Sequence, residues 1–173
     1  MRRVLLSAWI IVAVVASAGI ASAQRNPRAT AKLEVKGQAV SVEYGQPSLK
    51  GRTAQQLLGQ LAPGEVWRLG ADKSTTFSTG ADLVFGDLTV PKGDYSLWVR
   101  KEGDGWKLVF NKQHGQWGTE HNPAQDLGST PLKESKGEKS EEKVTIALAK
   151  EGDGGTLNIQ WGDQVLTTSF KAK

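Results

Sequence analysis

The sequence contains no cysteine and only two histidines among its 173 residues. The lack of cysteine excludes disulfide bonds, a lipid-modified cysteine after a leader, thiol catalysis and every metal site that needs a thiolate ligand. Because a Ser–His–Asp triad needs a histidine as its base, any such base must be His114 or His121. The sequence also lacks a Gly-x-Ser-x-Gly elbow, so it gives little support to nucleophilic hydrolysis.

An excess of charge of either sign is also missing. The chain carries 22 Lys and Arg against 18 Asp and Glu, and without Arg2 and Arg3 the net charge falls from +4 to +2. So weak a balance attracts neither nucleic acid nor an anionic membrane strongly, and we expect no nucleic-acid partner. After residue 23, no apolar run is long enough to span a membrane, and we expect no membrane span in the mature chain.

One long apolar run is present at the start of the chain. Two arginines precede an apolar stretch over residues 4–20, which ends in the small-residue sequence Ala-Ser-Ala. This three-part pattern predicts a cleaved secretory signal peptide over residues 1–23, a mature chain that begins at Gln24, and a periplasmic or secreted location. An uncleaved membrane anchor is the alternative, because the apolar run is nearly long enough to span a bilayer.

Alternation of apolar and polar residues dominates the rest of the chain. Leu33 and Val35, for example, alternate with Lys32 and Glu34, and the same period of two recurs up to Phe170. Many short alternating segments at close spacing are typical of β-sandwiches and barrels. We therefore predict one all-β domain over residues 24–173, an antiparallel β-sandwich of about 8–10 short strands with one short helix.

Several connections can be interpreted from their local sequence. Gly37-Gln38 is a candidate two-residue hairpin turn, and Thr53 is a candidate N-cap for a short helix that stops before Gly59 and closes one end of the sandwich. The repeated Lys-Glu-Gly-Asp-Gly segments at 101–105 and 150–154 are predicted hairpin loops, with a calcium loop as the alternative.

The charged segment 133–143 has no apolar alternation. It holds four Lys and four Glu and is net neutral. Such a composition favours a mobile, solvated loop, and we predict one here.

A set of short sequence blocks follows a recognisable order along the chain. The blocks are Pro27-Arg28-Ala29, Tyr44-Gly45-Gln46-Pro47-Ser48, Lys50-Gly51-Arg52, Val66-Trp67-Arg68-Leu69-Gly70-Ala71-Asp72, Pro91-Lys92-Gly93-Asp94-Tyr95-Ser96-Leu97, Asn111-Lys112 and Gln116-Trp117-Gly118. With them the chain resembles the domain of unknown function 2911 family of exported bacterial proteins over essentially all of residues 24–173. The resemblance implies the fold and export, and it implies no biochemical activity. Asp72 departs from the asparagine usual in that family, and His114 and His121 also stand where other residues are expected.

Both histidines fall in one segment that offers metal ligands. His114, Glu120 and His121, with Asp126 nearby, supply the nitrogen and oxygen atoms that zinc or copper accepts. The spacing matches no established ligand pattern, and adjacent Glu120 and His121 would point apart on a strand. We therefore expect no metal and no other cofactor, and a metal-assisted hydrolase is the runner-up hypothesis.

Arg68 and Trp117 are the most suggestive candidates for ligand binding. Arg68 alternates with Trp67 and Leu69, and a guanidinium in that place can grip a carboxylate or phosphate. The alternative is an internal ion pair with Asp72, Asp82 or Glu65. Trp117 lies between glycines, which allow a close backbone approach. We predict that it packs beside Arg68 as a cation–π pair and that both form a pocket rim. The candidate ligand-binding residues are Arg68, Asp72, Gln116 and Trp117.

The tryptophans guide the functional hypothesis. Trp106 and Trp161 follow the apolar sides of their segments and are predicted core residues, whereas Trp98 alternates with polar residues and is a candidate exposed side chain unless a loop covers it. Exposed aromatic rings suit sugar stacking or a protein partner. We therefore predict a non-catalytic exported protein that binds a glycan, a small anion or an envelope protein. The alternatives are the metal hydrolase and a structural envelope component without a pocket.

Overall fold

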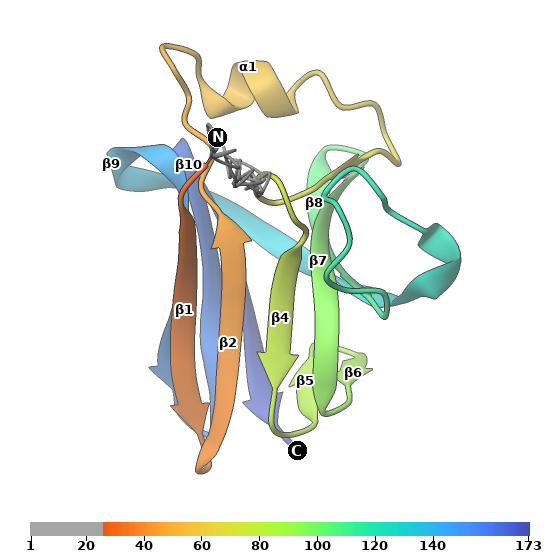
Figure 1. The fold of residues 1–173 in the computed structure, drawn as a ribbon. Coiled ribbons are helices and arrows are strands. Elements are labelled where there is room, and N and C mark those ends of the chain that lie inside the picture. Colours follow the sequence, from red (N-terminus) through yellow and green to blue (C-terminus); the bar gives the residue numbers. More distant parts are fainter. Residues whose placement is uncertain (1–25) are drawn as a thin grey trace, which may run out of the picture.

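The computed structural model describes residues 26–173, and the predicted signal peptide over residues 1–23 lies outside them. The described chain is mostly β-structure, with one short α-helix and one 3-10 turn (Figure 1). In chain order the elements are β1 (Arg28–Val35), β2 (Gln38–Gly45), α1 (Ala54–Leu58), β3 (Val66–Trp67), β4 (Thr75–Thr79), β5 (Leu83–Phe85), β6 (Leu88–Val90), β7 (Gly93–Glu102), β8 (Gly105–Asn111), η1 (Pro123–Gln125), β9 (Asp126–Glu151) and β10 (Gly154–Ala172). Within this part of the chain no helix is both long and apolar enough to cross a membrane.

The ten strands form one large antiparallel sheet. Their order is β1-β2-β4-β7-β8-β9-β10-β5-β6, and β3 pairs with β7 beside this path. The sheet is open, because β1 and β6 stand at its two ends. The predicted all-β antiparallel class with one short helix is therefore confirmed, while the division into two stacked sheets stays a prediction.

The long strand β9 is the reason that the strands do not separate into two sheets. Its first residues, from Asp126 to Leu132, pair with β8. Residues 133–136, 141 and 145–151 pair with β10. The sheet curls at this strand, so that β9 and β10 pass behind β1 and β2 (Figure 1).

The predicted loop at 133–143 is wrong, because these residues belong to β9. The backbone of Lys133–Lys136 pairs with Gln164–Thr167 of β10, and the register shifts beyond this stretch. Nearly all of the side chains of 133–143 are exposed, so neither face of the strand needs apolar residues. A strand that is solvated on both faces leaves no alternation in the sequence, although its first residues pair with β10.

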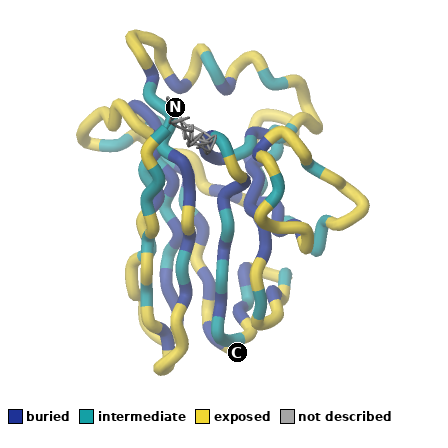
Figure 2. The backbone as a smooth tube through the Cα atoms, in the orientation of Figure 1, coloured by how far each residue is buried: buried dark blue, intermediate teal, exposed yellow. Residues whose placement is uncertain are grey.

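The hydrophobic core lies between the facing sides of the curled sheet. Figure 2 shows buried positions alternating along the strands, while the hairpin tips and the segment around α1 are largely exposed. Phe110 packs against Phe77 and Phe85, with ring centroids 5.4 and 4.8 Å apart. Trp106 and Trp161 are 5% and 7% exposed, as predicted for core residues.

The predicted turns are confirmed in kind, with one shift in position. The β1–β2 turn consists of Lys36 and Gly37, one residue before the predicted pair, with φ of 49° and 73°. Positive φ at both central residues is the type I′ geometry, which matches the twist of a hairpin and suits glycine at the second position. The two Lys-Glu-Gly-Asp-Gly segments close the β7–β8 and β9–β10 hairpins.

Helix α1 begins and ends where the sequence predicts. Thr53 Oγ1 accepts a hydrogen bond from the Gln56 backbone N–H at 3.1 Å, and Gln56 Oε1 accepts one from the Thr53 N–H at 2.9 Å. This capping box satisfies two backbone donors, and Gly59 caps the other end. The helix lies across one end of the sheet, where Ala54 and Leu58 are buried (Figure 1).

Candidate functional site

Two loops meet at the predicted ligand-binding residues. Lys73 and Trp117 form an isolated antiparallel bridge. On either side of it, the Gly118 N–H donates to the Asp72 carbonyl oxygen at 2.8 Å and the Ser74 N–H donates to the Gln116 carbonyl oxygen at 2.9 Å. We call the surface formed by Arg68, Asp72, Gln116 and Trp117 the Trp117 surface.

Gly118 brings Arg68 into the Trp117 surface. A methyl group at Gly118 would lie 2.9 Å from the Asp72 carbonyl oxygen and 3.1 Å from Arg68 Cδ, so only glycine leaves room for this approach. Arg68 therefore approaches the residue that follows Trp117, and the packing of Arg68 against Trp117 itself stays a prediction. The predicted cation–π pair is wrong, since the one such contact within residues 26–173 joins Lys101 to Trp106.

Arg68 is half-buried, and none of its expected partners pairs with it. Asp72 Oδ2 accepts hydrogen bonds from the backbone N and the Nδ2 of Asn26, at 3.1 and 3.3 Å. Asp82 and Glu65 each accept a hydrogen bond from a backbone N–H group. Among the described residues no ion pair includes Arg68, so the internal ion pair is not formed.

Trp117 is 49% exposed, and within residues 26–173 no other large hydrophobic side chain is exposed. Its loop is nevertheless well anchored. Gln116 Nε2 donates to Ser96 Oγ at 3.2 Å, and Ser74 Oγ donates to Gln116 Oε1 at 3.3 Å. Because both its amide nitrogen and its amide oxygen are hydrogen-bonded, Gln116 holds the Trp117 loop against Ser96 and Ser74.

His121 covers Trp98. The two rings lie 4.8 Å apart between centroids, and Trp98 is only 2% exposed. His121 Nε2 is 2.9 Å from Asp126 Oδ1, which also accepts a hydrogen bond from Asn111 Nδ2 at 2.7 Å. Trp98 is therefore covered by the loop and not exposed, which the alternation along its strand could not reveal.

The runner-up metal site lacks the geometry that it requires. Within residues 26–173, no three His, Asp or Glu side chains converge on one point, so His114, Glu120 and His121 do not form a ligand set. The physical reason is that His121 turns inward, onto Trp98 and Asp126, instead of toward the other two.

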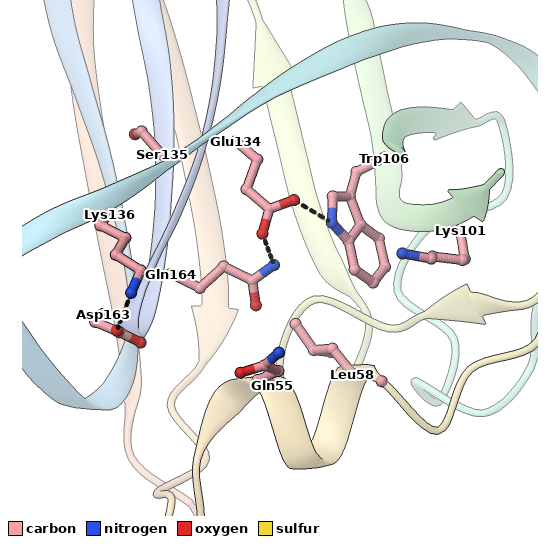
Figure 3. A pocket seen from close by; sticks show the side chains of 10 residues that line it. Gln55, Leu58, Lys101, Trp106, Glu134, Ser135, Lys136, Asp163 and Gln164 are labelled. Atoms are coloured by element: carbon pink, nitrogen blue, oxygen red, sulfur yellow. Dashed lines mark hydrogen bonds and ion pairs between the residues drawn. The ribbon is translucent and has the colours of Figure 1, made fainter. Parts of the chain in front are cut away.

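A recess under α1 is lined by residues that the sequence does not indicate as a binding site. It has a volume of about 470 Å³ and opens between α1, the β7–β8 hairpin, β9 and β10 (Figure 3). We call it the α1 recess; its lining residues include Gln55, Leu58, Lys101, Trp106, Glu134, Lys136, Asp163 and Gln164. These side chains come from distant parts of the chain, and Glu134 lies in the segment expected to be a loop, so no local motif marks the site.

The comparisons with known proteins agree with the sequence blocks. No curated protein and no solved structure matches the chain. A family model described as "Protein of unknown function (DUF2911)" matches residues 26–170. Because that match covers most of the 173 residues, the chain belongs to the DUF2911 family.

Proposed function

We propose that this chain is an exported, non-catalytic binding protein with a β-sandwich fold, and that it holds an envelope glycan on the Trp117 surface. The observation that carries the proposal is the 49% exposure of Trp117 on a hydrogen-bonded loop. An exposed indole offers an apolar face for a sugar ring, and a fixed loop loses little conformational entropy when a ligand binds.

Arg68 supports a glycan as the ligand. The aliphatic part of the Arg68 side chain lies beside Gly118, the residue after Trp117. No acidic side chain of the described residues forms an ion pair with its guanidinium. An arginine presents several N–H donors in a fixed plane, which can bind the hydroxyl or carboxylate oxygens of a sugar stacked on the indole. A small anion alone would leave the exposed ring unused.

The location is part of the proposal. The predicted signal peptide over residues 1–23 implies a mature chain that starts at Gln24 in the periplasm or the medium. N-terminal sequencing of the protein from cell fractions tests this. Finding Met1 retained in a membrane fraction would contradict cleavage and export.

Binding can be tested with purified envelope glycans, namely insoluble peptidoglycan and soluble envelope polysaccharide. We expect Trp117→Ala to weaken binding about tenfold or more, because a central aromatic contact often dominates an interface. Lys139→Ala, an exposed change on β9, is the control and leaves binding unchanged.

The alternatives give different results in the same experiment. Equal binding by the wild type and Trp117→Ala would reject the Trp117 surface as the glycan site. Capture of an envelope protein in place of any purified glycan, lost in Trp117→Ala, would replace the glycan by a protein partner. Binding of no glycan and no protein would favour the structural envelope component.

A further inference from the structure

The α1 recess contains a hydrogen-bond network that is separate from the Trp117 surface. Glu134 stands at its centre and accepts two hydrogen bonds, from Trp106 Nε1 to Oε2 at 3.1 Å and from Gln164 Nε2 to Oε1 at 3.0 Å (Figure 3). A carboxylate only accepts hydrogen bonds, and the Trp106 indole N–H only donates. Glu134 is therefore held by Trp106 and must receive the amide NH₂ of Gln164.

This contact fixes the orientation of the Gln164 amide. Because the NH₂ group faces Glu134, the carbonyl oxygen Oε1 faces the other way, toward α1 (Figure 3). That oxygen is buried and has no hydrogen-bond partner among the described residues. With almost no accessible surface, that oxygen is closed to a ligand, so the acceptor that a ligand in the recess can reach is the exposed Glu134 carboxylate, whose oxygens can each accept a further hydrogen bond.

The recess also offers donors. Lys101 Nζ lies 4.3 Å from the centroid of the Trp106 ring, and no ion pair of the described chain includes Lys101. Donor and acceptor groups thus lie around the same end of the helix.

The charges around the recess cancel. Two lysines, Lys101 and Lys136, stand against Glu134 and Asp163, and Lys136 Nζ is 3.9 Å from Asp163 Oδ2. An anionic ligand would be repelled by Glu134, and a cationic one by Lys101. A neutral ligand avoids both repulsions.

We infer that the α1 recess is a second ligand-binding site, separate from the Trp117 surface, for a small neutral polyhydroxylated molecule of the mono- or disaccharide class. A hydroxyl group is both donor and acceptor, so it can donate to a Glu134 carboxylate oxygen and accept from Lys101 Nζ. A volume of about 470 Å³ lies within the range of small-molecule sites, and Trp106 and Leu58 supply its apolar walls.

The test uses the purified, nitrogen-15-labelled protein and four probes: glucose, maltose, succinate and glycine. We expect glucose or maltose to shift the indole N–H signal of Trp106 and the side-chain amide signal of Gln164 in NMR spectra. Succinate and glycine should leave both signals in place. If neither sugar shifts them, the inference is wrong, and a response to succinate alone would assign the recess to anions.

Two variants and one matched control locate the site. Glu134→Gln keeps the size of the side chain but removes the charged acceptor, and Gln164→Leu removes the amide that orients Glu134. We expect each to weaken the sugar affinity about tenfold, the usual effect of losing one hydrogen bond. Glu138→Gln, an exposed change on the same strand outside the recess, should keep the wild-type affinity.

The outcome is independent of the proposed function. Trp117→Ala should leave the sugar affinity of the α1 recess unchanged, because Trp117 does not line the recess. A sugar-induced shift of the Trp106 signal that survives both Glu134→Gln and Gln164→Leu, or that disappears in Trp117→Ala, would reject the recess as the site.

Discussion

At the scale of one residue, the variant Arg68→Ala distinguishes a structural role of Arg68 from a binding role. Its candidate partners Asp72, Asp82 and Glu65 bond elsewhere, so truncating Arg68 strands no buried charge. We expect Arg68→Ala to change the free energy of unfolding by less than about 1 kcal/mol, while it weakens glycan binding. Urea unfolding measures the first effect. A loss of about 3–5 kcal/mol would instead reveal an orphaned buried partner and a structural role.

Gly45 illustrates a backbone contact that admits no side chain. A Cβ atom at this position would lie 2.3 Å from the Ala71 carbonyl oxygen. We expect Gly45→Ala to lower the free energy of unfolding by about 1–3 kcal/mol, the usual cost of overpacking. Gly105→Ala is the matched control, because its Cβ would meet only the Glu102 carbonyl oxygen, at 3.7 Å. Equal urea midpoints for the two variants would contradict this account.

The raised pKa of Tyr95 predicts a loss of stability at alkaline pH. Burial raises the pKa of the Tyr95 phenol, and the nearby carboxylates of Asp82 and Asp94 raise this pKa further. The unfolded chain then releases the phenolic proton first, so the stabilisation is complete below about pH 10 and is lost as the pH rises through the folded-state pKa. In Tyr95→Phe, the free energy of unfolding should fall less steeply above about pH 10.

The same variant has a second effect at neutral pH. Tyr95 Oη donates a hydrogen bond to the Pro91 carbonyl oxygen at 2.9 Å. Its loss should cost about 1 kcal/mol. Urea unfolding over a series of pH values tests both effects, and parallel curves for the two proteins would refute the pKa argument.

At the scale of elements, α1 and β9 differ in how local their signals are. Helix α1 is predicted correctly because its cap, Thr53 with Gln56, lies within four residues. Strand β9 is missed over 133–143 because its structure depends on pairing with β10, and its solvated side chains carry no alternation. The charged composition indicates solvated side chains there, but a solvated segment can still be a strand.

Hydrogen exchange tests the assignment of β9. Residues Lys133–Lys136 pair with β10, whereas no pairing with β10 is formed between Lys136 and Glu141. We expect the hydrogen-bonded amides of 133–136 to exchange at least about tenfold more slowly than those of 138–140, because exchange there requires local opening of the sheet. Uniformly fast exchange across 133–143 would contradict the strand and support the mobile loop predicted from the sequence.

At the scale of the whole molecule, Tyr44 joins the two sides of the curled sheet. Its hydroxyl donates to the Ile146 carbonyl oxygen at 3.3 Å and accepts from the Ile146 N–H at 2.9 Å. Tyr44→Phe leaves both buried backbone groups unpaired, and we expect it to lower the free energy of unfolding by about 1–3 kcal/mol. Thermal and urea unfolding measure the loss. An unchanged stability would mean that the contact between β2 and β9 contributes nothing.

The segment after β2 continues this connection. The Leu49 N–H donates to the Glu142 carbonyl oxygen at 2.9 Å, and the Val144 N–H donates to the Pro47 carbonyl oxygen at 3.1 Å. The sequence block from Tyr44 to Ser48, which helped to identify the family, therefore fastens β9 to the end of β2. Its conspicuous residues serve the fold, which is why they point to the family without indicating an activity.

The sequence by itself determined the antiparallel β-class, the capped helix, the hairpin loops and the burial of Trp106 and Trp161, because periodicity, caps and turns act over a few residues. It also placed Arg68 close to the Trp117 loop, through glycines that permit close approach. Only the tertiary structure decided that β9 continues through 133–143, that His121 covers Trp98, and that Glu134 and Gln164 meet under α1. These contacts join residues far apart along the chain, and their geometry depends on how the whole sheet pairs and curls.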